Sequence, residues 1–418
     1  MWTQSARSTG KRCPGLAAGL ALIGATVATS PGVWAQPPRD VKVAVIAPIS
    51  GPWARQGQLI QMGAEMAVDE INQKGGIKAL GGAKLKLVVA DAGDTAEKAK
   101  NAAQRLIAQE PDLIGGTGAW LSTFTLAVTE VTERAEIPWL TLSYADSITN
   151  RGFTFVFQTS PTAGTQSSQA LPTILELARS AGQQPGTVGI IADNTASPVF
   201  FLKPMREGGL AKMGLKTVMD ETYTPPLSDA TPLIQRARST RPDVLLFVST
   251  TISDNKLVFE KLNEFRLGRG AIPVIGNGAH NGAPEMLKNI PADLLEGYMF
   301  IVADWGLKGQ EAIIEQFKKR TGEPWMTQDA ITGYGDMWIL KEALERTGVA
   351  DKVKVAEQIR KMELKEGPAA LAFPGGVKFE ANGRRANAPL VIVQWQNGVP
   401  LSVYPTDRAL AKPRWPKQ

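Results

Sequence analysis

The chain has 418 residues, with 46 Lys and Arg against 40 Asp and Glu, 43% hydrophobic residues, one Cys and one His. This composition is typical of a folded protein of two or three domains, and it excludes a disordered chain, a collagen and a disulfide-stabilised scaffold. One Cys and one His leave no Cys/His zinc cluster, and Cys–His or Ser–His catalysis would depend on a single imidazole.

The first 35 residues have the features of a cleaved secretory signal. Three cations and no acid precede or border a short apolar stretch at 16–28, and residues 33–35 (Val-Trp-Ala) end in a small residue at an A-x-A-like site. A transmembrane anchor is the alternative, but it needs about 20 apolar residues, and Gly24 and Pro31 interrupt the run.

We therefore expect an exported protein, secreted through a signal peptide at 1–35 that is cleaved after Ala35. Cleavage removes Cys13 and leaves 43 cations against 40 anions, so most of the apparent basicity disappears. Nothing in this balance predicts binding to nucleic acid.

From residue 41 onward, short β-branched runs alternate with longer amphipathic stretches, which indicates strand–helix units and parallel sheets. A first set of strands is expected at 41–47, 83–91, 112–114, 137–143 and 153–159, with helices at 56–72, 95–109 and 122–134. After Pro161 the pattern restarts, with strands at 187–193, 215–223, 243–250, 272–277 and 297–304 and helices at 164–181, 200–213, 231–239 and 253–265. Two similar sets predict two lobes.

The last hundred residues break the alternation. Helices are expected at 310–320, 329–346 and 353–362, and then antiparallel strands at 376–380, 388–396 and 401–405, separated by Asn382-Gly383 and Asn397-Gly398.

Such a tail predicts three crossings between the lobes, near 158–163, 303–307 and 366–376. The fold class is thus α/β, with two interleaved Rossmann-like lobes joined by a multi-strand hinge. Lobe 1 is expected at 40–158 and 305–368, and lobe 2 at 159–304 and 369–418.

Several motifs in order carry a family resemblance. They are the Ser50-Gly51-Pro52 turn, Gly57 with Gly63-Ala64, Glu70-Ile71-Asn72, Lys74-Gly75-Gly76-Ile77, Asp91 and Asp94, Ile114-Gly115-Gly116, and VQWQNGVPLSVYP at 393–405. Over nearly all of 41–405 the chain resembles the periplasmic ligand-binding proteins of ABC transporters typified by the leucine/isoleucine/valine-binding protein. The resemblance implies a type I periplasmic-binding fold, a small ligand held between the lobes, and an ABC permease in the membrane as partner.

Candidate ligand-binding residues in the first lobe follow two strands. A glycine-rich loop at 115–121 is expected to run into a helix at Ser122, which can cap that helix and donate to a carboxylate. By resemblance, Ser122 and Thr123 occupy the carboxylate-binding region, and Ser143-Tyr144-Ala145 the next contact loop. The alternative is that Ser122 only caps its helix.

Two tryptophans and four polar residues, Asn194, Ser197, Thr250 and Asn277, complete the candidate site. Trp53 and Trp120 can form apolar walls, with packing between helices as the alternative, and Trp120 is favoured because a large ring in a glycine loop fits a core poorly. In the second lobe Asn194, Ser197 and Thr250 fall where family members contact the ligand, with ordinary polar loops as the alternative.

One departure from the family concerns the ligand's charge. Family members that bind aliphatic amino acids hold the ammonium with an acid after the strand matched by 272–276, whereas this chain continues Asn277-Gly278-Ala279-His280. Burying an ammonium without an anion is costly, so the sequence favours an organic acid, an aromatic acid or an amide over an α-amino acid. His280 is expected as a solvated loop residue, with a ligand contact as the alternative.

The acids Asp193, Asp254 and Asp304 are candidate substitutes for the missing ammonium partner. Spacing alone does not choose among them.

Enzyme motifs are weak in this sequence. It lacks the phosphate loop G-x-x-x-x-G-K-[ST] and the G-x-S-x-G elbow, and Ser253-Asp254-Asn255-Lys256 matches S-x-x-K without an accompanying K-T-G. We expect a non-catalytic binding protein without cofactor or metal. The alternatives are a ligand sensor of the same fold acting on a regulatory partner, or an exported enzyme on a doubly wound fold.

Overall fold

The computed structural model describes residues 9–10 and 39–415. Apart from residues 9 and 10, the expected signal peptide, its cleavage after Ala35 and the removal of Cys13 lie outside the described residues. In the part of the chain that is described, no helix is both long and apolar enough to span a membrane.

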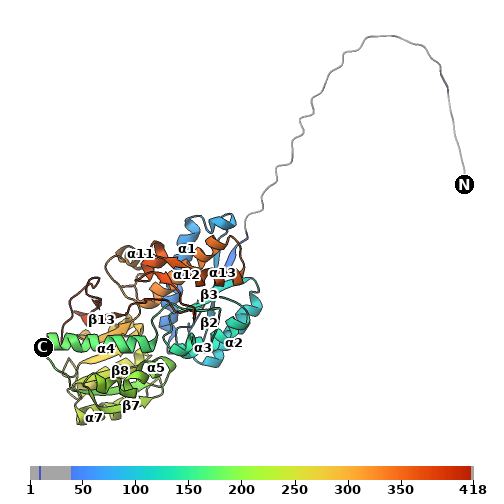
Figure 1. Ribbon diagram of the computed structural model, residues 1–418. Coiled ribbons are helices and arrows are strands. Elements are labelled where there is room, and N and C mark those ends of the chain that lie inside the picture. The colour runs from blue at the N-terminus through green and yellow to red at the C-terminus, as the bar shows by residue number, and fades with distance from the viewer. Residues whose placement is uncertain (1–8, 11–38, 416–418) are drawn as a thin grey trace. The chain divides into compact units, whose positions relative to one another are not determined.

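The first sheet is fully parallel and forms the centre of the first lobe (Figure 1). In spatial order its strands are β2 (Leu85–Asp91), β1 (Val41–Ala47), β3 (Leu113–Gly118), β4 (Trp139–Thr141) and β5 (Val156–Gln158). A parallel sheet ends all its strands at one edge, and the loops at that edge form a natural crevice.

The second sheet is mixed. Its strands, in spatial order, are β14 (Val399–Tyr404), β13 (Val391–Gln396), β10 (Met299–Val302), β9 (Val274–Asn277), β8 (Val244–Val248), β6 (Thr187–Asp193) and β7 (Lys216–Tyr223). The strands from β10 to β7 are parallel to one another, whereas β13 pairs antiparallel with both of its neighbours, β10 and β14. A two-stranded ladder joins β11 (Glu363–Leu364) to β12 (Val377–Lys378).

Helices cover both sheets. Those with the first sheet are α1 (Ala54–Gln73), α2 (Ala96–Gln109), α3 (Ser122–Arg134), α11 (Glu311–Thr321), α12 (Gln328–Thr347), α13 (Lys352–Arg360) and α14 (Gly367–Ala372). Those with the second are α4 (Ala163–Ser180), α5 (Ala196–Pro204), α6 (Leu210–Lys212), α7 (Thr231–Thr240), α8 (Ile252–Glu264), α9 (Glu285–Asn289) and α10 (Ala292–Leu295). In Figure 1 the blue α1 lies beside the orange α12, so two helices far apart in the sequence share the first lobe.

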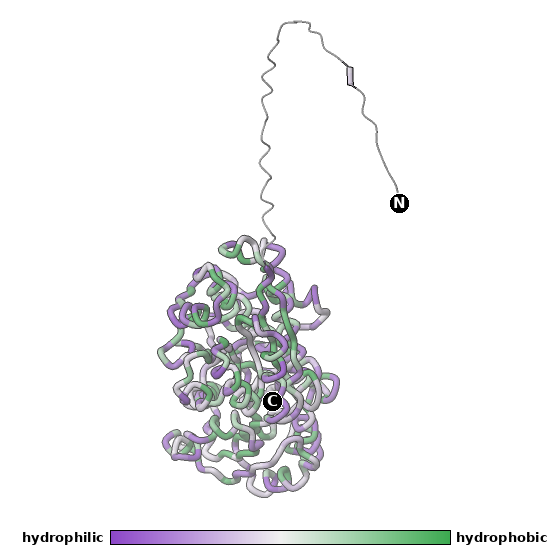
Figure 2. The backbone as a smooth tube through the Cα atoms, turned by 90° about the vertical axis from the view of Figure 1, so that its right-hand side faces the viewer, coloured by the Kyte–Doolittle hydropathy of each residue, from purple (hydrophilic) through white to green (hydrophobic). Residues whose placement is uncertain are grey.

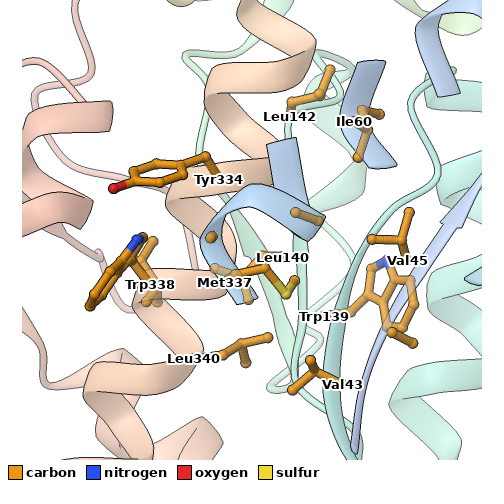
Figure 3. Close-up of a cluster of buried hydrophobic side chains, with 14 of the residues drawn as sticks. Val43, Val45, Ile60, Trp139, Leu140, Leu142, Tyr334, Met337, Trp338 and Leu340 are labelled. Carbon is orange, nitrogen blue, oxygen red and sulfur yellow. The ribbon is translucent and has the colours of Figure 1, made fainter. Parts of the chain in front are cut away.

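Helix α12 is the best buried helix of the first lobe. In Figure 3, Met337 and Leu340 point from α12 toward Leu140 and Val43 of the sheet. On another face α12 lies against α1 so closely that a Cβ atom at Gly63 would stand 2.0 Å from the carbonyl oxygen of Ala330. This close approach fixes the first turn of α12, which carries two residues of the site described below.

Separate hydrophobic clusters give each lobe its own core. One cluster joins the strands of the first sheet to α1, α12 and α14, and the last residue in the sequence that belongs to it is Phe379. The next buried hydrophobic residue along the chain, Leu390, belongs to a cluster of the second lobe. In Figure 2 hydrophobic stretches run through the interior of the folded part, and hydrophilic stretches gather at its margin. The first-lobe core therefore extends past the expected boundary at residue 368.

Three crossing segments join the lobes, at 159–162, 303–310 and 380–389, and the third lies later than the expected 366–376. The side chain of Arg385 links the third crossing to the first, because its Nε donates to the carbonyl oxygen of Thr159 (2.6 Å). Its Nη1 donates to the carbonyl oxygen of Pro374 (2.9 Å). Burial lowers the pKa of Arg385 to about 10, and the nearby carboxyls of Asp304 and Asp336 oppose that shift.

Three expectations about elements need correction. Gly115–Gly118 belong to strand β3 rather than to a loop. Glycine is needed at Gly116 because a Cβ atom there would stand 2.4 Å from the ring of Trp139. The helix expected at 200–213 begins at Ala196 and is interrupted by a π turn at Met205–Gly209.

The third correction concerns the tail. Asn397-Gly398 does turn β13 into β14, with positive φ at both residues, as expected. The turn at Asn382-Gly383, however, closes a short hairpin in which Phe379 bridges Arg385, and β12 pairs with β11 instead of joining the sheet of β13.

Candidate functional site

A cavity with about 410 Å³ of space between its walls, part of it open to solvent, lies where the carboxyl ends of strands from both sheets meet. Its walls come from the loops after β3, β4, β8 and β9 and from the first turns of α5 and α12. The lining residues are Trp120, Leu121, Ser122, Leu142, Ser143, Tyr144, Ser197, Pro198, Ser249, Thr250, Asn277, Gly278, Ala279, His280, Gln328 and Asp329. A concave, largely apolar space with a few polar groups is the usual form of a small-molecule site.

Ser122 organises the wall formed by the first lobe. It is the first residue of α3, and its Oγ accepts hydrogen bonds of 3.1 Å from the backbone N–H groups of both Tyr144 and Ala145. It does not cap its helix as expected, since Leu121 is the N-cap residue and no side-chain cap bond forms. Because both lone pairs of Oγ accept, the Ser122 hydroxyl hydrogen is left to donate to a further acceptor.

Ser143 holds the loop after β3 in place. Its Oγ donates to the carbonyl oxygen of Trp120 (2.7 Å) and shares a 2.6 Å hydrogen bond with Thr125 of α3. The loops after β3 and β4 are thus joined to each other and to α3, so this wall is pre-organised.

Trp120 links the same wall to α12. Its indole Nε1–H donates to Oδ1 of Asp329 over 2.9 Å, and its ring meets the ring of His280 edge-on at 6.4 Å between centroids. Burial raises the pKa of Asp329 to about 7, against the opposing effects of the Trp120 bond and the charge of Arg55. Burial also lowers the pKa of His280 to about 3, so this imidazole is neutral.

Gln328 precedes Asp329, and hydrogen bonds to its own side-chain carbonyl oxygen, Oε1, hold it in place. Oε1 accepts from the Tyr144 hydroxyl (2.6 Å) and from the backbone N–H of Ala303 (2.7 Å). Burial raises the pKa of Tyr144 above its ordinary value, which keeps its hydroxyl a donor. With Oε1 occupied, Nε2 of Gln328 is a buried donor that finds no partner in the described part of the chain.

The second-lobe wall is polar and already internally bonded. Thr250 donates to Oδ2 of Asp193 (2.6 Å), Asn277 donates to Oε1 of Gln166 (2.8 Å), and Ser249 Oγ lies 3.3 Å from Nε2 of His280. Burial raises the pKa of Asp193 to about 6, partly offset by its bonds to Thr195 and Thr250.

Most of the sequence-predicted residues come together in this cavity. Seven of them line it, namely Trp120, Ser122, Ser143, Tyr144, Ser197, Thr250 and Asn277.

Four predicted residues lie elsewhere. Trp53 packs edge-on against Phe124 at 5.4 Å, and Asn194 is exposed and donates to Thr224. Thr123 accepts from the backbone of Ala196 instead of facing the cavity, and Ala145 contributes only its N–H to Ser122. Trp53 thus has the packing role that the sequence left as its alternative.

His280 is not the solvated loop residue that the sequence favoured. It is 1% exposed and lies in the short 3-10 turn Ala279–Gly282. Gly282 packs so closely on Phe300 and Trp305 that the turn is drawn into the core, and His280 faces the cavity.

Gln328 and Asp329 were missed by the sequence reasoning. A signal existed: Asp329 and Asp336 are seven residues apart in a helix otherwise rich in apolar residues, so both lie on one buried face. Each of the three candidate substitute acids accepts a hydrogen bond from another group, and none lines the cavity, although Oδ2 of Asp304 is buried without a partner among the described residues. Asp193 accepts from Thr250, Asp254 accepts from Tyr223, and Asp304 accepts from the N–H of Trp305.

The cavity is lined by few charged side chains. None of the residues that line it is Lys or Arg, and Asp329 is its one acid. Within the described residues, no group of three or more His, Cys, Asp or Glu is placed to hold a metal ion.

The fold and this interlobe cavity together define a periplasmic binding protein. A family model described as periplasmic binding protein matches residues 40–399. The match spans most of the chain, so the chain belongs to this family, as the motif resemblance predicted.

Similar proteins come from Brucella. Leu/Ile/Val-binding protein homolog 8 of Brucella melitensis biotype 1 is 28% identical over 411 residues, which cover 95% of this chain and 98% of that protein. Leu/Ile/Val-binding protein homolog 7 of Brucella abortus is 29% identical over 407 residues, which cover 95% of this chain and 99% of that protein.

Solved structures share the fold. The branched-chain amino acid transporter substrate-binding protein LivJ of Streptococcus pneumoniae, in complex with isoleucine, has a TM-score of 0.76 at 18% identity, over 87% of this chain and 98% of that chain. An ABC transporter solute-binding protein of R. palustris, in complex with benzoate, has a TM-score of 0.73 at 17% identity, over 90% and 98%. The expected two-lobed α/β architecture of type I periplasmic binding proteins is thereby confirmed.

Proposed function

We propose that this chain is an exported, extracytoplasmic solute-binding protein of an ABC transporter. It captures a small amino acid-like compound, or an organic or aromatic acid, between two closing lobes and delivers it to a permease in the membrane. It acts in the periplasm after its signal peptide is cleaved behind Ala35, and it changes no covalent bond of its ligand.

One observation carries this proposal. The cavity takes its walls from both lobes, so a compound inside it contacts Ser122 and Tyr144 on one side and Ser197, Thr250 and Asn277 on the other. A ligand that touches both lobes at once stabilises their closed arrangement over any open one. The closed arrangement is then the form a permease can recognise.

The relatives support the ligand class. The structures named above hold isoleucine and benzoate, and a further one, from Rhodopseudomonas palustris BisB5, holds 3,4-dihydroxybenzoic acid. All three ligands are compact and carry a carboxylate. The free hydroxyl hydrogen of Ser122 and the positive dipole end of α3 suit such a group.

The test uses protein expressed with its complete leader and purified from the periplasm. Mass spectrometry of its N-terminus checks cleavage after Ala35. A thermal-shift panel then compares amino acids, aromatic acids, amides and short organic acids, because a ligand at a hundred times its Kd stabilises the native state by about 2.7 kcal/mol. Retention of the protein in the cytoplasm, or a midpoint that no compound moves, contradicts the proposal.

The alternative functions give different results. A ligand sensor of the same fold shows the same thermal shift, but deletion of its gene leaves uptake of the radiolabelled ligand unchanged. An enzyme converts the bound compound, which chromatography of the released ligand detects. Binding with uptake lost on deletion, and with the ligand recovered intact, is the expected result.

A further inference from the structure

Two buried polar atoms at the cavity have no hydrogen-bond partner among the described residues. They are Oδ2 of Asp329 and Nε2 of Gln328, on adjacent residues of the first turn of α12. Both residues line the cavity and neither is exposed. A buried polar group without a partner is costly, so the free oxygen of Asp329 needs a donor that no described side chain supplies.

The surroundings of Asp329 decide which kind of donor fits. From the loop after β3, Trp120 donates to the other oxygen, Oδ1. The side chain of Arg55 on α1 acts on Asp329 through its charge, but its guanidinium binds Glu285 and Glu323 at 2.7 and 2.5 Å. His280 is neutral, and Tyr144 directs its hydroxyl to Gln328.

We propose that Asp329 is the residue that binds the ligand's protonated nitrogen, so that the captured solute is a compact zwitterion with its carboxylate at the start of α3 and its ammonium at the start of α12. This inference rests on the proposed binding function and narrows its ligand class. It also changes the sequence-based preference for ligands without an amino group.

The two ends of the cavity differ in the side-chain groups they offer, which orients the ligand. At the N-terminus of α3, which lines the cavity through Ser122, the Ser122 hydroxyl hydrogen is free to donate and the helix dipole is positive, which suits a carboxylate. At α12, the carboxyl of Asp329 accepts, which suits an ammonium and repels an anion. The acid that the family places after the strand at 272–276 is thus supplied here by a different element.

The experiment compares matched ligands that differ only by the amino group. The pairs are L-leucine with 4-methylpentanoate and L-phenylalanine with 3-phenylpropanoate, each titrated by calorimetry into the full mature protein. The variants are Asp329→Asn, which keeps an acceptor for Trp120, and Asp336→Asn as matched control. Asp336 lies on the same helix, is equally buried and does not line the cavity.

The expected result has three parts. The wild-type protein binds an amino-bearing compound at least about 30-fold more tightly than its des-amino partner, because a buried charge needs its counter-charge. Asp329→Asn abolishes this preference by weakening the amino-bearing compound about 30-fold or more. Asp336→Asn keeps both affinities within about threefold, the range usual for a site that shares no partners with the ligand.

A pH series gives an independent readout that needs no variant. Only ionised Asp329 attracts the ammonium, so the affinity of the wild-type protein for the amino-bearing compound falls as the pH drops below about 7. Its affinity for the des-amino compound does not fall in this way. Asp193 and Asp304 also have raised pKa values, near 6 and 8, so the pH dependence alone does not identify the group that titrates. Loss of the pH dependence in Asp329→Asn assigns it to Asp329.

Two results would overturn the inference, and they are distinguishable. If the des-amino compounds bind at least as tightly and Asp329→Asn changes nothing, Asp329 is not the nitrogen site although the proposed function stands. If no panel compound binds the folded wild-type protein, or if the bound compound is converted, the proposed function fails and this inference fails with it.

Discussion

Nε of Arg55, on α1 of the first lobe, lies 2.7 Å from a carboxylate oxygen of Glu285, on α9 of the second. The Arg55 side chain also binds Glu323 at 2.5 Å through Nη2, and all three side chains are mostly buried. This ion pair crosses from lobe to lobe outside the cavity, so it stabilises the closed arrangement without touching a ligand.

Glu285→Gln is therefore expected to favour opening. Arg55 keeps its pair with Glu323, so folding is spared, while loss of the interlobe pair costs about 1 kcal/mol or less because the pair is partly solvated. Apparent ligand affinity should fall up to about fivefold, and small-angle scattering of the ligand-free protein should show a larger radius of gyration.

The matched control for this ion pair is Asp220→Asn. Arg206 and Asp220 form a comparable pair at 2.5 Å, but both lie in the second lobe. If Asp220→Asn weakens ligand binding as much as Glu285→Gln does, the effect is general electrostatics and the interlobe role is wrong.

Trp120→Phe tests the hydrogen bond that holds Asp329. The ring is kept, but the donor to Oδ1 is lost, so the buried carboxyl is left without any donor in the protein. We expect unfolding free energy at pH 8 to drop by about 1–3 kcal/mol and the pKa of Asp329 to rise further above its ordinary value. Urea unfolding and carboxyl-carbon NMR titration measure the two effects.

Trp53→Phe is the control for this change. Trp53 is also a buried indole, but its Nε1 has no hydrogen-bond partner. Its replacement should leave the pH dependence of stability as it is. An equal loss in both variants would mean that ring packing, rather than the bond to Asp329, explains the effect.

The sequence predicted the architecture because its signals are local and repeated. Strand–helix alternation placed the sheet strands and long helices to within a few residues, and Asn397-Gly398 marked its hairpin. Gly115 and Gly116 misled because glycine serves two purposes: they suggested a loop near a ligand, but they make room for Leu340 and the Trp139 ring.

The candidate site was predicted only where residues follow a strand. Ser122, Tyr144, Thr250 and Asn277 do so, and the rule that crevices form at the carboxyl ends of strands brought them together. Asp329 begins a helix more than 200 residues away from Trp120, and only the packing of α12 on α1 brings them into contact. Such a long-range contact has no local signal.

Buried acids should make the protein less stable as the pH rises. Burial raises the pKa of Asp336 to about 7 and that of Asp304 to about 8, well above their unfolded values near 4. Between about pH 4 and pH 8 the native state then binds more protons than the unfolded state, so unfolding free energy falls with increasing pH, by up to about 1.4 kcal/mol per pH unit and group.

Asp336→Asn tests this relationship. The amide cannot ionise, and its oxygen can still accept from the Thr117 hydroxyl. Urea unfolding of the wild type and the variant at pH 5 and pH 8 should show a shallower decline in the variant. A variant as pH-dependent as the wild type would exclude Asp336 as a contributor.

The contact between α1 and α12 gives the last prediction. Gly63→Ala places a methyl group 2.0 Å from the carbonyl oxygen of Ala330, next to Asp329, and backbone on both sides leaves no flexible side chain to move. The helices must separate, at a cost of about 1–3 kcal/mol for an overpacked core, and the first turn of α12 must shift. We expect a lower melting temperature and weaker ligand binding together. Gly186→Ala is the control, because the nearest atom to its added Cβ is 3.8 Å away and is a side-chain oxygen of Asp243. If Gly63→Ala lowers stability but leaves ligand affinity unchanged, the position of α12 does not determine ligand binding. The cavity wall formed by Gln328 and Asp329 would then tolerate a shift of the helix, contrary to our expectation.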